Sequence, residues 1–176
     1  FPVDICHEDD GSLTLVIDSN VIPTSSHNLS FIKNCVAVSA ISISLGVKLQ
    51  DLRIRIQNFS APEGRCFVKQ IKDITVIDDT YNANLTSSLA ALDYLSAFSG
   101  NGRKIFVFGD MYELGPTTDK QHQQIGERCL ELNLDGVFTI GEYTKHTNLI
   151  INDGMMSKHF MNKKDLINSL QKIIES

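Results

Sequence analysis

The pattern of hydrophobic and polar positions changes near residue 62. Before it, two short apolar segments flank the turn Glu8-Asp-Asp-Gly11 and predict a β-hairpin, because a carboxylate and a glycine favour a tight reversal. Two helices follow, with apolar residues three and four positions apart, and Gly46 ends the first of them. Pro62-Glu-Gly-Arg65 then breaks the periodicity, and we place a domain boundary there. The predicted elements are strands over 1–6 and 12–17, a helix over about 31–45 with Val36, Ala37, Ala40, Ile41 and Leu45 inward, and a helix through Leu49, Leu52, Ile56 and Phe59.

After the boundary, short apolar segments alternate with longer segments of helical periodicity. Crossover helices of this length connect parallel strands in right-handed βαβ units, so the alternation predicts a mainly parallel sheet flanked by helices. The fold class is therefore α/β for residues 63–176, preceded by a hairpin and two helices in residues 1–62. The predicted strands cover 73–78, 104–108, 136–140 and 158–161, and the predicted helices cover 87–98, 119–132, 143–150 and 163–174, the last with Leu166, Leu170 and Ile173 inward.

Composition narrows the classes of protein. The 176 residues, 42% of them hydrophobic, suit one ordinary domain or slightly more. A net charge of -5 with scattered Lys and Arg gives no basic face, so we do not expect a nucleic-acid partner. No apolar segment is long enough to span a membrane and none resembles a signal peptide, so we expect a cytoplasmic protein. Because the chain opens on Phe1 without Met and stops directly after a helix, we also expect a piece of a longer protein.

The cysteines and histidines give no metal or redox motif. Cys6, Cys35, Cys66 and Cys129 form no CxxC pair, and apolar neighbours favour small buried side chains over catalytic thiols. None of the 5 histidines has a second candidate ligand four residues later.

The sequence also contains neither GxxxxGK[ST] nor GxGxxG, so this chain alone does not present the usual phosphate cradle. One cation is a candidate for phosphate binding. Arg65 stands beside Gly64 at the predicted domain boundary, where a guanidinium can hold a phosphate through two hydrogen bonds. The alternative is a surface salt bridge.

Polar side chains gather directly after the first predicted strand of the second domain. Asp78 and Asp79 could accept hydrogen bonds from a ribose or hold a cation-bound phosphate, or they could cap a helix or form a solvated turn. Tyr81, Asn82 and Asn84 add a phenol and two amides to the same loop, which favours a ligand.

A second polar loop, Gly109-Asp-Met-Tyr-Glu-Leu-Gly115, follows the next predicted strand. Asp110 can cap a helix or face a ligand, and adjacent parallel strands would bring Asp79 and Asp110 to the same edge of the sheet. His122 falls in the first turn of the following helix, where a packed or capping histidine is favoured over a general base.

Taken together, these motifs resemble those of a known enzyme family. Asp78-Asp-Thr-Tyr-Asn-Ala-Asn84 and Gly109-Asp-Met-Tyr-Glu-Leu-Gly115, with His122 behind them, resemble the DDSYNAN and GDMxELG motifs of the Mur ligases, in particular their MurF branch. Upstream, Asn34 in an Ala- and Ser-rich helix and Pro62-Glu-Gly-Arg65 resemble the end of the family's central ATPase domain. The resemblance covers nearly the whole chain.

The resemblance implies a cytoplasmic, monomeric, ATP-dependent amide ligase of peptidoglycan synthesis. In this family, ATP phosphorylates the carboxylate of UDP-N-acetylmuramoyl-tripeptide, and the amine of D-alanyl-D-alanine attacks the acyl phosphate, with Mg²⁺ and cationic side chains stabilising the charge. Residues 1–62 would be the tail of a P-loop-type central ATP-binding domain. Residues 63–176 would be most of a Rossmann-like C-terminal domain, with the last strands missing.

The resemblance also implies roles for individual residues. Asn34 matches the adenine-contacting Asn, Arg65 the nucleotide-phosphate Arg, and Asp79 the Asp that holds the nucleotide at the domain interface. The loop that faces ATP and the incoming dipeptide is matched by Tyr81, Asn82 and Asn84, and further contacts in the second loop are expected from Asp110, Glu113 and His122.

The chain departs from the family pattern in one stretch and lacks other parts of it. The family has His-Asn three residues before the adenine Asn; here Ser30-Phe31 stand there and His27-Asn28 lies upstream, through either a small insertion or loss of the pair. The P-loop, the magnesium ligands and the UDP-binding domain are outside this sequence, so we expect no catalysis by the chain alone and no metal ligand in it. The alternatives are a stand-alone Rossmann-like module that binds a nucleotide or dipeptide, or another Mur or folylpolyglutamate-type ligase.

Overall fold

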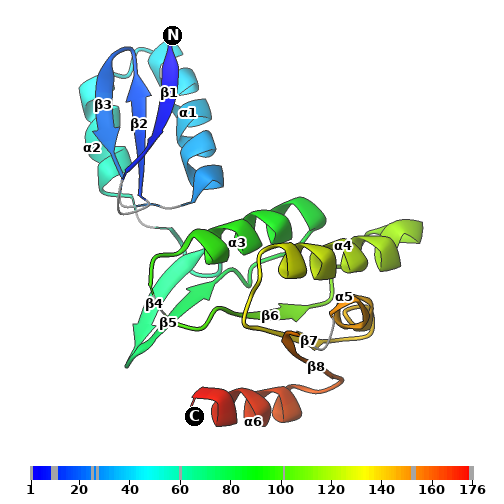
Figure 1. Cartoon of the computed structure of the whole chain (residues 1–176). Coiled ribbons are helices and arrows are strands. Elements are labelled where there is room, and N and C mark those ends of the chain that lie inside the picture. The colour runs from blue at the N-terminus through cyan, green and yellow to red at the C-terminus, as the bar shows by residue number, and fades with distance from the viewer. Residues whose placement is uncertain are drawn as a thin grey trace. The chain divides into compact units, whose positions relative to one another are not determined.

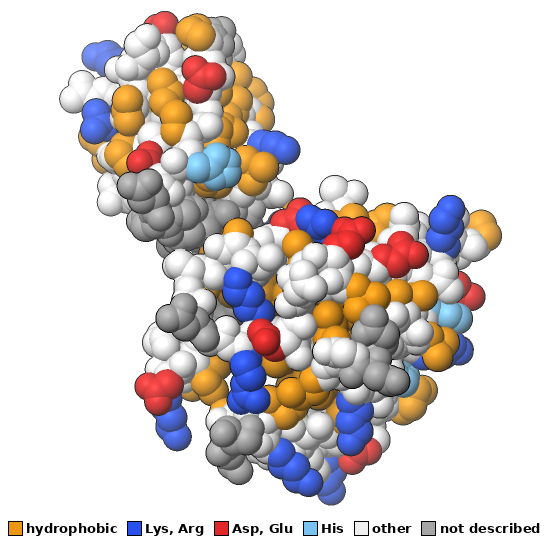
Figure 2. All heavy atoms as spheres, viewed as in Figure 1, with side chains coloured by type: hydrophobic (Ala, Val, Ile, Leu, Met, Phe, Trp, Pro, Cys, Tyr) orange, Lys and Arg blue, Asp and Glu red, His pale blue; other side chains and the backbone are white. Residues whose placement is uncertain are grey.

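The chain folds into two compact units in this computed structural model, which describes residues 2–8, 12–24, 26, 28–59, 61–100, 102–151 and 154–174 (Figure 1). Unit 1 comprises residues 1–79 and 97–100, and unit 2 comprises residues 80–96 and 101–176. No helix among the described residues has the length and apolar character that crossing a membrane requires. On the face that Figure 2 shows, acidic and basic side chains are interspersed.

Unit 1 begins with an antiparallel sheet in the order β1-β2-β3, made of β1 (Val3–His7), β2 (Leu13–Ile17) and β3 (Asn20–Pro23). The predicted hairpin is confirmed, although most of its turn lies outside the described residues. β3 was not predicted; it follows a two-residue turn in which Asp18 and Ser19 both adopt positive φ, the geometry of a tight hairpin.

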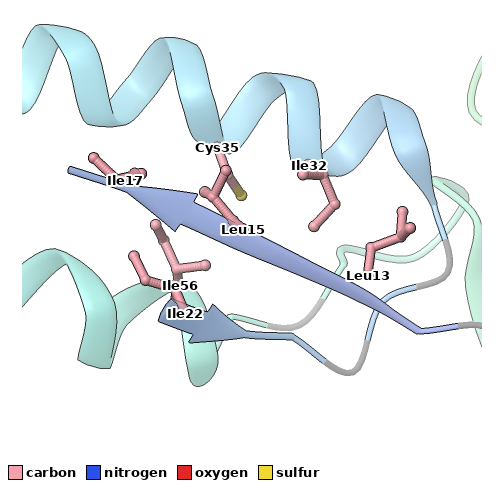
Figure 3. Close-up of a cluster of buried hydrophobic side chains, with 7 residues drawn as sticks. All are labelled: Leu13, Leu15, Ile17, Ile22, Ile32, Cys35 and Ile56. Atoms are coloured by element: carbon pink, nitrogen blue, oxygen red, sulfur yellow. The ribbon is translucent and has the colours of Figure 1, made fainter. Parts of the chain in front are cut away.

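Helices α1 (Leu29–Ser44) and α2 (Leu49–Gln57) cover one face of this sheet. Figure 3 shows the core between them, which consists of Leu13, Leu15, Ile17, Ile22, Ile32, Cys35 and Ile56. Gly46 has φ +86 and follows α1 as predicted.

The predicted inward face of α1 was right only in part, since Val36 packs against the core. The buried residues are Ile32, Cys35 and Ser39, whereas Ile41 is 62% exposed and Leu45 is 78% exposed. The apolar residues of α1 are spread around the helix axis, so the periodicity of its sequence does not identify which side meets the sheet.

The last part of unit 1 is a second antiparallel hairpin, β4 (Phe67–Ile71) and β5 (Ile74–Asp78), joined through Lys72 at φ 53. β4 was not predicted. β5 was expected to neighbour the strand at 104–108, but in the described part of the chain it pairs with β4 instead. The pairing that would have brought Asp79 and Asp110 to one sheet edge is therefore absent from the described sheets.

Unit 2 confirms the predicted parallel sheet, with β6 (Ile105–Gly109), β7 (Gly136–Ile140) and β8 (Met156–Phe160) in the order β6-β7-β8. Two helices, α3 (Leu85–Ala97) and α4 (Thr118–Glu131), lie on one side of it, and α6 (Lys163–Ile174) lies on the other (Figure 1). The short helix α5 (Lys145–Ile150) packs against α4, and the 3-10 turn η1 (Gly115–Thr117) leads into α4.

Separate hydrophobic clusters join these helices to the two faces of the sheet. Leu92 of α3 and Ile125 of α4 pack with Phe108 and Val137. On the other face, α6 packs on Phe138 and Phe160 through Leu166, Leu170 and Ile173, as predicted. Of the candidate residues, Asp110 and Glu113 lie on the loop that follows the carboxyl end of the parallel strand β6.

Candidate functional site

Asp79 follows β5 and is held by the start of β4. Because the two strands are antiparallel, with Phe67 opposite Asp78, the residues before β4 and after β5 meet at one end of the hairpin. There the backbone N–H of Cys66 donates a hydrogen bond of 2.9 Å to Oδ1 of Asp79. The reversal that permits this contact uses positive φ at Gly64 (φ 75) and Cys66 (φ 52). Asp79 is therefore a fixed and partly buried carboxylate.

The thiol of Cys66 lies in the same place. Burial and, to a smaller extent, the nearby Asp79 carboxylate together raise the pKa of the Cys66 thiol to about 12, while the Asn28 side chain opposes the shift. The thiol is therefore protonated near neutral pH and able to donate.

The other two predicted nucleotide residues are exposed. Asn34 lies on the outer side of α1. Arg65 is exposed just before β4, and its backbone N–H donates to the carbonyl of Pro62 at 3.2 Å. Asp78, the neighbour of Asp79, forms an ion pair of 3.2 Å with Lys69, so the two carboxylates have different partners.

The loop before α3 presents exposed polar side chains, and one of them caps the helix. The Oδ1 of Asn84 accepts from the Ser87 N–H at 2.9 Å, while the Asn84 N–H donates to the Ser87 hydroxyl at 3.1 Å. Asn82 accepts from the N–H of Ala83 at 2.9 Å, and Tyr81 is 70% exposed. These reciprocal hydrogen bonds hold Asn84 at the start of α3, three residues after the exposed Tyr81.

Asp110 anchors the loop that follows β7. Its carboxylate accepts hydrogen bonds from three successive backbone N–H groups, those of Glu142 (2.7 Å), Tyr143 (2.9 Å) and Thr144 (2.8 Å). Gly141 adopts φ +133, and a Cβ there would overlap the Asp110 carboxylate. Of the two alternatives for Asp110, the structure therefore favours a cap over a ligand contact.

His122 is fully buried in α4 and ties the second polar loop to that helix. Its Nε2 accepts from the Met111 N–H at 3.1 Å, and its Nδ1 donates to the Thr118 carbonyl at 2.8 Å. The partners define the neutral tautomer, because an N–H must face a carbonyl and a lone pair must face an N–H. Both ring nitrogens have backbone partners, which is the arrangement of a packed histidine. Glu113, in the same loop, is exposed at φ 63.

A shallow cleft of about 600 Å³ lies between the beginnings of α3 and α4. It is lined by Asn84, Leu85, Thr86, Thr117, Lys120, Gln121 and Gln124. Of these residues, only Asn84 was predicted from the sequence as a site residue, because Lys120 and the two Gln residues look like ordinary solvated helix positions. An ammonium and several amides can bind a polar or anionic group. Among the described residues, no three His, Cys, Asp or Glu side chains form a group that could hold a metal ion.

Comparison with known proteins gives a consistent result. Residues 64–176 match the family model described as Mur ligase, glutamate ligase domain. The chain is 32% identical over 146 residues to the UDP-N-acetylmuramoyl-tripeptide--D-alanyl-D-alanine ligase of Haemophilus influenzae, which covers 82% of this chain and 31% of that protein. The Escherichia coli ligase of the same name is 33% identical over 149 residues, or 84% of this chain and 31% of the relative.

Comparison with solved structures also finds MurF ligases. A MurF structure from Acinetobacter baumannii has a TM-score of 0.85 at 25% identity and covers 98% of this chain and 38% of the other. The MurF ligase of Thermotoga maritima, crystallised in complex with ADP, has a TM-score of 0.76 at 23% identity over 96% of this chain and 39% of that one, a likeness of fold. The chain thus spans about a third of the length of the curated relatives that it matches.

Proposed function

Because this chain belongs to the Mur ligase family, we propose that it is part of a ligase that joins D-alanyl-D-alanine to UDP-N-acetylmuramoyl-tripeptide at the expense of ATP. The observation that carries the proposal is the similarity to ligases of that name over 82% and 84% of the chain. The paired motifs Asp78-Asp-Thr-Tyr-Asn-Ala-Asn84 and Gly109-Asp-Met-Tyr-Glu-Leu-Gly115 support it.

The proposed domain boundary follows residue 62. Residues 1–62 would belong to the central ATP-binding domain and residues 63–176 to the C-terminal domain, which is supported by a family match that begins at residue 64. The β4-β5 hairpin, which lies in compact unit 1, would then be the beginning of the C-terminal domain. The protein that contains both is proposed to be cytoplasmic and monomeric.

The reaction needs two displacements that this chain does not complete alone. A carboxylate oxygen of the tripeptide attacks the γ-phosphorus of ATP, which forms an acyl phosphate and releases ADP. The amine of the dipeptide then attacks the acyl carbon, the amine loses a proton, and the tetrahedral intermediate expels inorganic phosphate. Mg²⁺ would neutralise phosphate charge during these steps, but the described residues contain no group suited to hold it. We therefore derive no step for this chain through the metal.

In this proposal, the residues of this chain bind and orient the nucleotide and the dipeptide. Asn34, Arg65 and Asp79 contact the nucleotide, as adenine ligand, phosphate cation and fixed carboxylate. In support, Arg65 directly precedes Cys66, whose N–H holds Asp79. The loop that faces ATP and the dipeptide consists of Tyr81, Asn82 and Asn84.

Residues of the second loop have a different proposed role. Asp110 and His122 are proposed to shape the loops around the site through their hydrogen bonds to backbone groups. Glu113 is exposed on the same loop and remains the candidate there for a ligand contact.

The test is the substrate dependence of ADP release by the longer protein that contains this chain. We expect ADP only when the UDP-linked tripeptide and D-alanyl-D-alanine are both present. Turnover with L-lysine or glutamate in place of the dipeptide would assign the protein to another ligase of the family.

A binding module is the second candidate, favoured by the absence of a GxxxxGK[ST] motif from this sequence. Calorimetry on the 176-residue chain with ATP, ADP and D-alanyl-D-alanine distinguishes the two. Micromolar binding would support a module, whereas the ligase proposal expects affinity no tighter than about millimolar, because half of the site is supplied by another part of the protein.

A further inference from the structure

The cleft between α3 and α4 is lined almost entirely by polar side chains. It lies wholly within unit 2, and its volume of about 600 Å³ is in the range of small-molecule sites. Of the seven described residues that line it, six are polar and the other is Leu85. None of these seven carries a carboxylate, and Lys120 alone among them is charged. The cleft is therefore positive and rich in hydrogen-bond donors.

Lys120 brings an unpaired ammonium group to this cleft. It is exposed in the first turn of α4, and within the described part of the chain no carboxylate pairs with it. Its acidic neighbour Asp119 instead contacts the Nε2 of His146, at 3.2 Å. One turn further along α4, the side-chain amide of Gln124 likewise has no hydrogen bond to another described residue. The cleft therefore offers a cation and an amide that are both available to a ligand.

Other lining side chains are held in place by protein groups. The Nε2 of Gln121 donates to the Thr117 hydroxyl at 2.7 Å, and that hydroxyl donates to the carbonyl of Leu114 at 2.8 Å. On the α3 side, the Oδ1 of Asn84 accepts from the Ser87 N–H at 2.9 Å. These hydrogen bonds restrict both sides of the cleft before a ligand arrives, which lowers the entropic cost of binding.

A carboxylate is the ligand group that suits the available side chains. The ammonium and the amide N–H both donate, and a carboxylate has two oxygens that accept. A nucleotide triphosphate suits them less well, because its several negative charges would meet a single cation. In the proposed reaction, D-alanyl-D-alanine brings one carboxylate that takes no part in the chemistry. It also brings methyl groups, which suit contact with Leu85.

We propose that this cleft binds the terminal carboxylate of the incoming dipeptide, with Lys120 as its counter-ion and Gln124 as a second donor. The inference rests on the proposed function and names the part of the chain that recognises the dipeptide. Asn84 supports the assignment, because it lines the cleft and also belongs to the loop proposed to face the dipeptide. The amine at the other end of the dipeptide stays free to attack the acyl carbon. Lys120 therefore determines specificity and takes no part in bond formation.

The experiment compares Lys120→Met with Lys120→Arg in the longer protein that contains this chain. Methionine keeps an unbranched side chain without the charge, whereas arginine keeps the charge. We expect Lys120→Met to raise the KM for D-alanyl-D-alanine roughly three- to tenfold, with kcat within about twofold and unchanged KM values for ATP and the tripeptide. Lys120→Arg should keep the KM for the dipeptide within about twofold of the wild type. The control is Lys164→Met, which removes an exposed ammonium from the first turn of α6 and should change none of these values.

The C-terminal amide of the dipeptide tests the same contact from the ligand side and needs no variant. It keeps the size of D-alanyl-D-alanine but replaces the carboxylate by a neutral group. The wild type should use this amide with a KM raised at least roughly threefold over that for the dipeptide. Lys120→Met should discriminate little between the two, because the cation that distinguishes them is absent.

Three results would overturn this proposal. The first is an equal KM of the wild type for the dipeptide and its amide, and the second is an undiminished preference for the dipeptide in Lys120→Met. The third is a rise in the KM for ATP or for the tripeptide in Lys120→Met, in place of a rise in that for the dipeptide. A wild-type protein that does not turn over the dipeptide at all would instead refute the proposed function, and the inference with it.

Discussion

Replacing Asp110 by alanine should destabilise unit 2 markedly. The carboxylate accepts from three successive N–H groups, and the substitution removes their acceptor while leaving the loop in place. A hydrogen bond to a charged group contributes about 1.5–3 kcal/mol net, but water can replace it where the donor is exposed. Glu142 is exposed and Tyr143 is half-buried, whereas Thr144 is fully buried and its N–H would stay without a partner. We therefore expect a loss of about 2–4 kcal/mol.

Denaturant unfolding of the 176-residue chain measures this loss, and hydrogen exchange locates it. The amide protons of residues 142–144 should lose protection in Asp110→Ala before those of the β7 strand do. Asp110→Asn should be intermediate, because one acceptor oxygen remains without its charge. Glu113→Ala, which removes an exposed carboxylate from the same loop, is the matched control and should change the free energy of unfolding by less than about 0.5 kcal/mol. An Asp110→Ala variant as stable as this control would refute the anchoring role.

Three further predictions concern packing, pH and thiol reactivity. Gly126→Ala should destabilise by about 1–3 kcal/mol in denaturant unfolding, because its Cβ would lie 2.6 Å from the carbonyl oxygen of Thr147; wild-type stability would contradict the close packing of α4 on α5. Burial lowers the pKa of His159 in the folded chain below 6.5, so this imidazole binds a proton more readily in the unfolded chain. The free energy of unfolding should therefore be highest above about pH 6.5 and decrease as the pH falls toward the pKa of His159 in the folded chain. In thermal melts, the melting temperature of His159→Gln should decrease less at low pH than that of the wild type. Identical pH profiles of the two proteins would show that the His159 imidazole does not cause the decrease. In brief alkylation followed by peptide mass spectrometry, exposed Cys6 should react first and Cys129 only after unfolding, because burial raises the pKa of the Cys129 thiol to about 12; equal rates would contradict this order.

The parallel sheet of unit 2 could be predicted from sequence because each of its elements has a clear period and is bounded by turn residues. The strand predicted at 136–140 and the helix predicted at 163–174 have the observed bounds. β4 could not be recognised in the same way, since Lys69 and Gln70 interrupt its apolar residues and its partner strand begins only three residues after it ends.

The chemistry of the loops was harder to predict than their positions. A carboxylate after a strand can hold a ligand or cap a neighbouring segment, and only the three-dimensional structure brings residues 142–144, more than 30 positions away, onto Asp110. The two backbone partners of His122, which make it a packed residue, likewise become visible only in the structure. The hydrogen bond between the Cys66 N–H and Asp79 could not be predicted either, because it depends on a positive φ at Cys66 that the sequence does not reveal.

The product formed by the longer protein provides the most direct test of the proposed ligase reaction. The protein is incubated with ATP, D-alanyl-D-alanine and UDP-N-acetylmuramoyl-tripeptide whose terminal carboxylate carries ¹⁸O, and the products are weighed by mass spectrometry. The account predicts a UDP-linked product heavier by one dipeptide less one water, and one ¹⁸O atom in the released inorganic phosphate, because the acyl phosphate transfers a carboxylate oxygen to phosphorus. A UDP-linked product that gains a single amino acid instead, or phosphate without the label, would contradict it.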